Sequence, residues 1–145
     1  MKIKDAENQL LAPVKKIFGA RKYIFKTEVP FHKKSIDVMI GNTQTKEITA
    51  IELKVKNWNK ALRQAVVYQL CSHKVYVAIF KKYFNPKNAK SFAQFGVGII
   101  LIDLEKRKLK GKIFLEAKRS KAINRFYLEG FMKIYFGKNK NAYKS

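Results

Sequence analysis

Apolar and polar side chains alternate along several short segments of this chain, which is the pattern of strands with one buried face. These segments are residues 22–29, 36–40 and 48–55. Residues 73–80 and 96–103 are almost wholly apolar and indicate strands covered on both faces. Pro30 is expected to end the first strand, because proline donates no backbone hydrogen bond. An edge strand is expected at residues 110–117.

The segments between these strands predict helices, since apolar side chains recur there every three or four residues. The expected helices cover residues 5–20, 57–72, 85–95 and 123–135. Pro13 should remove one hydrogen bond from the first helix and kink it. In the second helix an apolar stripe is expected to pack on the sheet; it consists of Leu62, Val66 and Leu70. The last helix is expected to supply core side chains rather than a surface that stacks bases.

The length of the chain suits one domain, because 145 residues, 47% of them hydrophobic, can bury one ordinary core. We expect that core in residues 5–104, a C-terminal hairpin strand and helix in residues 105–136, and a basic tail in residues 137–145. No apolar run is long enough to cross a bilayer. Cys71 is the only cysteine, which excludes a disulfide framework and fits a reducing cytoplasm.

The net charge of the chain indicates the class of partner that it is expected to bind. Lys and Arg number 32 against 10 Asp and Glu, a net charge of +22. So large an excess attracts polyanions strongly, and nucleic acid is the first expected partner. The alternative interpretation of this excess is a lysine-rich surface that is simply solvated. An anionic membrane is a less favoured partner than nucleic acid. We expect DNA, with RNA as the other possibility, and no membrane.

Two carboxylates come together in the hairpin expected from residues 36–40 and 48–55, with its turn at residues 41–43. If the apolar faces of the two strands are paired, Asp37 lies on the same side as Glu52 and Lys54. Neighbouring strands are about 4.8 Å apart, so both carboxylates can reach one divalent cation.

Hydrolysis of a phosphodiester needs a metal that polarises the phosphate and activates a water. Mg²⁺ prefers hard oxygen ligands, which Asp37, Glu52 and the backbone carbonyl of Leu53 would supply. Lys54 would position or deprotonate the water, or neutralise charge on the phosphate. In the following helix, Gln64 and Tyr68 form an i, i+4 pair that lies off the apolar stripe.

The chain resembles the PD-(D/E)XK nuclease superfamily in the order of these motifs, most closely the branch with a QxxxY helix that includes the RecB nuclease domain and lambda exonuclease. The motifs are Asp37, then Glu52-Leu53-Lys54, then Gln64-Ala65-Val66-Val67-Tyr68. The resemblance implies a restriction endonuclease-like α/β fold, with an αβββαβ core whose mixed central sheet is flanked by helices, plus a C-terminal strand and helix. One departure is Ile36, which stands where the superfamily name has proline.

Roles for individual residues follow from the resemblance. It implies Asp37 and Glu52 as metal ligands and Lys54 as the catalytic lysine. It also implies that Gln64 and Tyr68 contact the substrate or orient the ligands.

Four other residues have two readings each. Glu7 is either a carboxylate that favours a helix N-terminus or a third acidic ligand, which some superfamily members place on the first helix. Glu28 is either acidic support for the site or a surface partner of a lysine. Lys56 continues the face of Glu52 and Lys54, where it would contact substrate or simply be solvated. Trp58 either stacks on a base or packs at the helix start. His32 and His73 match no metal-binding motif.

These patterns predict a Mg²⁺- or Mn²⁺-dependent deoxyribonuclease of the cytoplasm. The alternative is a non-catalytic nucleic-acid-binding module of the same fold, acting as a subunit of a larger complex. A nuclease directed at RNA is a third hypothesis. A homodimer is compatible with each of them.

Overall fold

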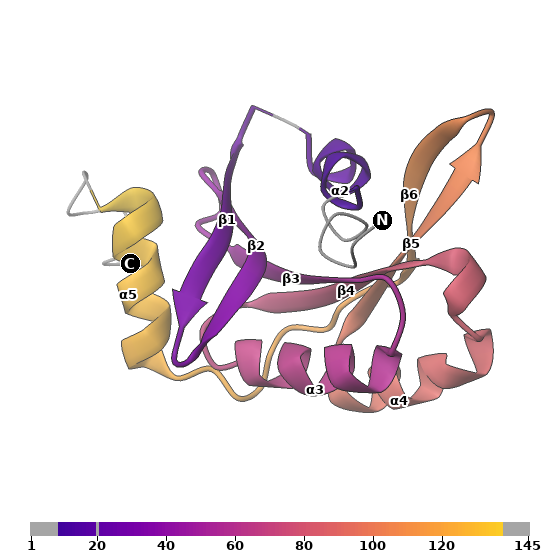
Figure 1. The fold of residues 1–145 in the computed structure, drawn as a ribbon. Coiled ribbons are helices and arrows are strands. Elements are labelled where there is room, and N and C mark those ends of the chain that lie inside the picture. The colour runs from indigo at the N-terminus through magenta and orange to yellow at the C-terminus, as the bar shows by residue number, and fades with distance from the viewer. Residues whose placement is uncertain (1–8, 20, 138–145) are drawn as a thin grey trace.

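The computed structural model describes residues 9–19 and 21–137, which form a six-stranded mixed sheet with helices on both faces (Figure 1). In chain order the elements are α2 (Leu11–Ile17), β1 (Tyr23–Phe31), β2 (Lys34–Asn42), β3 (Ile48–Lys54), α3 (Trp58–Tyr68), β4 (Lys74–Phe80), 3₁₀ turns at Lys81–Tyr83 and Pro86–Asn88, α4 (Ala89–Phe95), β5 (Gly98–Glu105), β6 (Lys108–Leu115) and α5 (Arg125–Phe136). The expectation of an α/β fold is confirmed.

The strands lie side by side in chain order, from β1 to β6. β1, β2 and β3 form an antiparallel meander, β3, β4 and β5 are parallel, and β6 returns antiparallel to β5. Parallel neighbours need crossover connections. α3 and α4 occupy these crossovers, and both cover the same face of the sheet (Figure 1).

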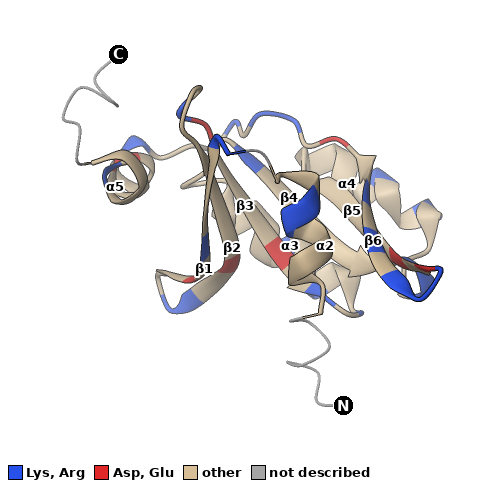
Figure 2. Ribbon diagram, turned by 90° about the horizontal axis from the view of Figure 1, so that it is seen from above, with Lys and Arg blue, Asp and Glu red and all other residues tan. Residues whose placement is uncertain are grey.

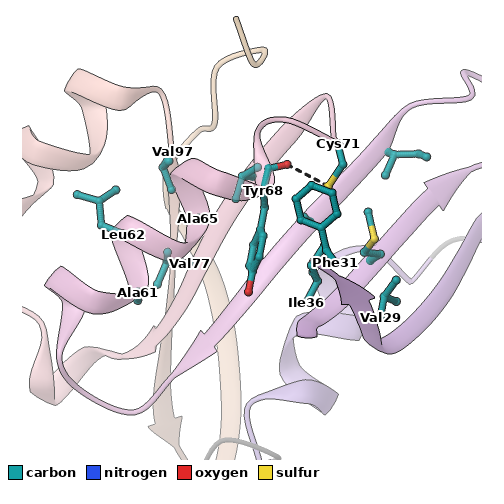
Figure 3. Close-up of a cluster of buried hydrophobic side chains, with 14 of the residues drawn as sticks. Val29, Phe31, Ile36, Ala61, Leu62, Ala65, Tyr68, Cys71, Val77 and Val97 are labelled. Atoms are coloured by element: carbon teal, nitrogen blue, oxygen red, sulfur yellow. Dashed lines mark hydrogen bonds between the residues drawn. The ribbon is translucent and has the colours of Figure 1, made fainter. Parts of the chain in front are cut away.

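Each face of the sheet has its own apolar core. On one face, Leu10 and Val14 from the segment around α2 pack on strand residues such as Ile51. On the other, side chains of α3, α4 and α5 pack on the alternate strand residues, for example Val77 (Figure 3). In the described residues no helix is both long and apolar enough to cross a bilayer.

The face that α3 turns to the sheet differs from the predicted one. Its buried residues are Ala61, Leu62, Ala65 and Tyr68, whereas Val66 and Leu70 are only partly buried at the margin of the same cluster. The prediction is correct for Leu62 and wrong for Tyr68, which belongs to the packed face. Small alanine side chains let the helix backbone approach the sheet, and the tyrosine ring fills the space beside them.

Both prolines of the N-terminal region have different effects from those expected. Pro30 does not end β1, which continues to Phe31 with Pro30 paired to Ser35. β1 is the outer strand of the sheet, where a missing N–H costs no ladder hydrogen bond on the free side. Pro13 lies in the first turn of α2, where no residue of the helix accepts an N–H, so it does not interrupt the described helix.

The β2–β3 turn falls later than residues 41–43, because β2 continues through Gly41 and Asn42. Asn42 Oδ1 accepts hydrogen bonds from the N–H groups of Gln44 and Thr45 and so shapes the turn. Gly41 is required for packing: a Cβ there would stand 2.7 Å from Cδ1 of Tyr135 in α5.

The last helix is only partly a core helix. Phe131 and Tyr135 are buried, as expected, and so is Phe136, but Phe126 and Ile134 are 81% and 58% exposed. Basic residues concentrate at the turns of the molecule, including the β1–β2 and β5–β6 turns (Figure 2). The expected start of the first helix, with Glu7, and nearly all of the expected basic tail lie outside the described residues.

Candidate functional site

The sheet opens where β2 begins and β3 ends. The two strands pair from Gly41–Ile48 to Val38–Ile51, although β2 starts at Lys34 and β3 runs on to Lys54. Beyond the last pair the two backbones are not joined in the ladder.

Asp37 occupies this opening between the strands. Its Oδ2 accepts a hydrogen bond of 2.8 Å from the N–H of Leu53. A hydrogen bond also links its carboxyl group to Glu52, the next residue along β3 after the last paired position. The fold therefore brings together the two carboxylates that the alternation pattern placed on one face.

The site is crowded with negative charge. Burial raises the pKa of Asp37 above its ordinary value, and the nearby Glu28 carboxylate on β1 raises it further. The Leu53 N–H, the hydrogen bond with Glu52 and the charge of Lys54 oppose this rise without cancelling it. Glu28 thus acts electrostatically on Asp37. Two carboxylates at this depth favour a shared proton or a bound cation.

Tyr68 reaches the same place from α3. Its ring is 1% exposed and lies beside Phe31 in the cluster shown in Figure 3. Its hydroxyl donates to the carbonyl oxygen of Ser35 at 3.3 Å. Burial, together with the carboxylates of Glu52 and Asp37, raises the pKa of the Tyr68 phenol, so the hydroxyl stays protonated beside Glu52.

Gln64, one turn before Tyr68, opens with it onto a groove of about 630 Å³ between α3 and the β1–β2 turn. The groove has an apolar floor that includes Phe31 and Val67. Its walls carry four cationic side chains: Lys33, Lys34, Lys60 and Arg63. The Gln64 Oε1 is buried and accepts no hydrogen bond from the residues that the structure describes. Tyr68 links the groove to the carboxylates, since it lines the groove and lies close to both Glu52 and Asp37.

The remaining predicted residues lie around this centre in different ways. Lys54 is close enough for its charge to act on Asp37. Lys56 is exposed in the loop after β3. Trp58 is partly buried and packs on Phe92 with ring centroids 5.9 Å apart, which matches its reading as a packing residue. It also borders a second surface groove, between α3 and α4.

The donor atoms at the site suit a hard cation. In a strand the N–H and C=O of one residue point to the same edge, so the Leu53 carbonyl points toward β2, as its N–H does. Two carboxylates and one carbonyl form an all-oxygen set of the kind Mg²⁺ and Mn²⁺ prefer. Residues 9–19 and 21–137 contain no group of three His, Cys, Asp or Glu side chains arranged for a metal. Glu7 falls outside those ranges.

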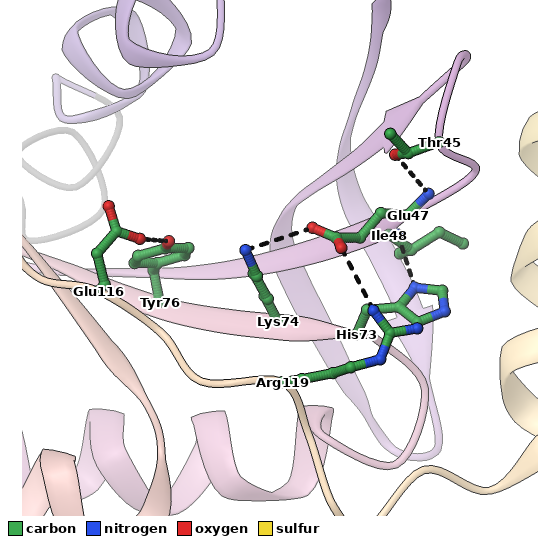
Figure 4. Close-up of polar contacts among 8 residues, drawn as sticks. All are labelled: Thr45, Glu47, Ile48, His73, Lys74, Tyr76, Glu116 and Arg119. Carbon is green, nitrogen blue, oxygen red and sulfur yellow. Dashed lines mark hydrogen bonds and ion pairs between the residues drawn. The ribbon is translucent and has the colours of Figure 1, made fainter.

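A second polar cluster lies at the opposite end of β3 (Figure 4). Glu47 Oε1 lies 3.7 Å from Lys74 Nζ, and its Oε2 lies 3.5 Å from Arg119 Nη1. His73 Nδ1 accepts the N–H of Ile48 at 2.9 Å. Burial and the charge of Arg119 lower the pKa of His73. Glu47, Lys74, Arg119 and the Nδ1 atom of His73 therefore all have partners within the protein.

His32 serves in packing as well. It lies in the β1–β2 turn and packs on Phe31, with the two rings tilted and their centroids 4.4 Å apart. Both histidines therefore act as structural residues of turns and strand ends, as the absence of a histidine motif led us to expect.

Comparison with known proteins yields a fold likeness. No protein-family model matches the chain, and no curated protein matches it. A solved structure described as "SPO1766 protein of unknown function from Silicibacter pomeroyi" is similar to it with a TM-score of 0.63 and 17% sequence identity. The match covers 98% of this chain and 91% of that one. This likeness extends over the whole sheet and carries no functional assignment.

Proposed function

We propose that this chain is a metal-dependent nuclease with a restriction endonuclease-like core, acting on DNA. One observation carries the proposal: the Asp37–Glu52 pair lies where β2 and β3 are no longer paired, close to Tyr68, which lines a groove together with four cationic side chains. The described element order α2-β1-β2-β3-α3-β4 supports it, because this is the αβββαβ order that the motif resemblance implies.

Asp37, Glu52 and the carbonyl of Leu53 would hold Mg²⁺ or Mn²⁺. The bound ion supplies a Lewis acid for the phosphate and lowers the pKa of a coordinated water. Leu53 N–H fixes one oxygen of Asp37, which leaves its other oxygen for the ion. Tyr68 lies beside Glu52 with a protonated hydroxyl and restrains the orientation of that carboxylate.

The other side chains act on the nucleic acid. Lys54 stands at the carboxylates, where its ammonium orients the attacking water or balances charge that develops on the phosphate. Lys33, Lys34, Lys60 and Arg63 neutralise phosphates along the groove. Gln64 lines the same groove, where its side chain would contact a substrate group.

Cleavage assays with purified variants test this proposal. Wild-type protein should cleave with Mg²⁺ or Mn²⁺ and stop in EDTA, whereas Asp37→Asn, Glu52→Gln and Lys54→Ala should lose about 10²-fold or more of the rate. Glu47→Gln is the matched control, because it removes a carboxylate from the other end of β3. Metal-dependent cleavage that survives in Glu52→Gln would overturn the assignment.

A panel of single-stranded DNA, duplex DNA, branched DNA and RNA separates the substrate classes. Preference for RNA would support the RNA-directed hypothesis in place of the DNA-directed one. Salt-sensitive binding without metal-dependent turnover would support the second candidate, a non-catalytic binding subunit. The net charge of +22 favours that candidate equally, but two adjoining carboxylates, of which Glu52 is buried, do not help bind a polyanion. We propose that the protein acts in the cytoplasm.

A further inference from the structure

Helix α5 leaves an apolar strip open to solvent. Phe126 is 81% exposed, and Ile134, two turns further along the same side, is 58% exposed. Gly130 lies between them, and a Cβ built on it would meet nothing within 4 Å. We call the surface formed by Phe126, Gly130 and Ile134 the aromatic shelf. Its middle position carries no side chain, so the surface there is open.

The shelf is connected to the groove at the carboxylates through a row of rings. The Phe126 centroid lies 5.7 Å from that of Tyr127, which lies 5.0 Å from that of His32. His32 in turn lies 4.4 Å from Phe31. Phe31 and His32 line both the groove and the hollow beside α5. The two concave surfaces are therefore neighbours separated by one turn of chain.

The charges around the shelf indicate what covers it. The hollow beside α5 is lined by Lys133 and one acid, Glu129, and the neighbouring groove is lined by Lys33 and Lys34. Arg125 directly precedes Phe126 in α5. A protein partner with an ordinary apolar patch has no need of this excess of cations. A nucleic-acid strand carries a flat apolar ring and an anionic phosphate on every unit, and so matches both features.

We propose that Phe126 is a base-stacking residue that binds an unpaired nucleotide of a strand running from the groove across the β1–β2 turn. In a duplex the bases are already stacked on one another, so an unpaired segment alone can present its ring to the shelf. This inference rests on the proposed function and adds a substrate class to it: nucleic acid with a single-stranded portion.

Binding measured without cleavage tests the inference. In EDTA, fluorescence anisotropy would report the Kd of the full chain for a labelled single strand of about 12 nucleotides and for a blunt duplex of the same length. Phe126→Ala should weaken binding of the single strand about 5- to 100-fold and of the duplex less than about 2-fold. Phe126→Trp should retain the affinity of the wild type.

Phe114→Ala is the control, because Phe114 is a surface phenylalanine, 46% exposed, on β6 at the opposite edge of the sheet from β1. It should leave both affinities unchanged. A 2-aminopurine base in the strand should change fluorescence on binding to wild type and not to Phe126→Ala. Equal losses for strand and duplex, or no loss, would overturn the inference. So would a dimer in sedimentation that Phe126→Ala dissociates, since the shelf would then be covered by a second copy.

The two proposals fail in different ways. If no metal or substrate supports cleavage, the nuclease assignment is rejected while selective loss of strand binding in Phe126→Ala still supports the stacking role. If cleavage is intact and Phe126→Ala binds single strands normally, the stacking role is rejected and the nuclease assignment is kept.

Discussion

The carboxylates at the two ends of β3 lie in opposite electrostatic surroundings. Glu47, the residue directly before β3, lies within ion-pair distance of Lys74 and Arg119 (Figure 4). At its far end Glu52 faces another acid, Asp37, whose pKa is raised by burial and by Glu28. The first end satisfies its charges within the protein. The second concentrates like charges beside a groove, which destabilises the ion-free fold and is common at functional sites.

The largest effect is expected for substitution of Asp37 at the second end, where activity should fall while thermal stability rises. Asp37→Asn should reduce cleavage about 10²- to 10³-fold and raise the melting temperature in EDTA. A raised folded-state pKa means that the fold prefers Asp37 protonated, so its charge destabilises the protein at pH 7 and an uncharged amide relieves that cost. Mg²⁺ should raise the melting temperature of the wild type and not of Asp37→Asn. Thermal unfolding with and without Mg²⁺ measures all of these.

The next effect concerns Tyr68, which joins the second end to α3. Tyr68→Ala should cost about 3–5 kcal/mol of unfolding free energy because it empties a buried site. Tyr68→Phe keeps the ring and loses only the hydroxyl, at a cost of about 0.5–1.5 kcal/mol. Urea unfolding gives the stabilities. If the hydroxyl restrains Glu52, Tyr68→Phe also lowers kcat at saturating Mg²⁺; unchanged kcat would assign Tyr68 to packing alone.

A pH effect is expected at the first end. The pKa of His73 is lowered in the fold from 6.5, so the folded protein holds the ring neutral. Above that value both states are neutral and nothing is lost. As pH falls through 6.5 the unfolded chain gains a proton more readily, and the unfolding free energy decreases. His73→Gln should flatten this decrease between about pH 7 and 5, measured by urea unfolding. An unchanged slope would show that another group titrates there.

The smallest effect is expected for substitution of Glu47, the carboxylate that is paired with two cations. Glu47→Gln should lower the unfolding free energy by about 0.2–1 kcal/mol and leave cleavage intact, because its ion pairs are partly exposed. A large loss of cleavage in this variant would break the contrast between the two ends.

Several features of the fold and the candidate site could be predicted from the local pattern. Period-2 alternation placed Asp37, Glu52 and Lys54 on one side of a hairpin, since a strand admits only two faces. The apolar runs of β4 and β5 likewise indicated strands buried on both sides. In each case the period alone specifies which residues share a face.

Other features depended on packing between distant segments. Apolar size suggested Val66 and Leu70 as the buried face of α3, but the sheet accepts Ala61, Ala65 and Tyr68 because small side chains allow closer contact. Pro30 lies inside a strand because that strand is the outer one. Neither feature can be predicted from the sequence until the elements that pack beside α3 and β1 are known.

The sequence by itself determined the strands and helices, the side of the hairpin on which the acids lie, and the strongly basic character of the chain. Only the tertiary structure decided that β2 and β3 part at Asp37, that Glu28 adds its charge there, and that Phe126 stays in solvent. The reason is physical: periodicity assigns residues to faces within one element, whereas depth, separation and cover are set by contacts between elements far apart in the chain.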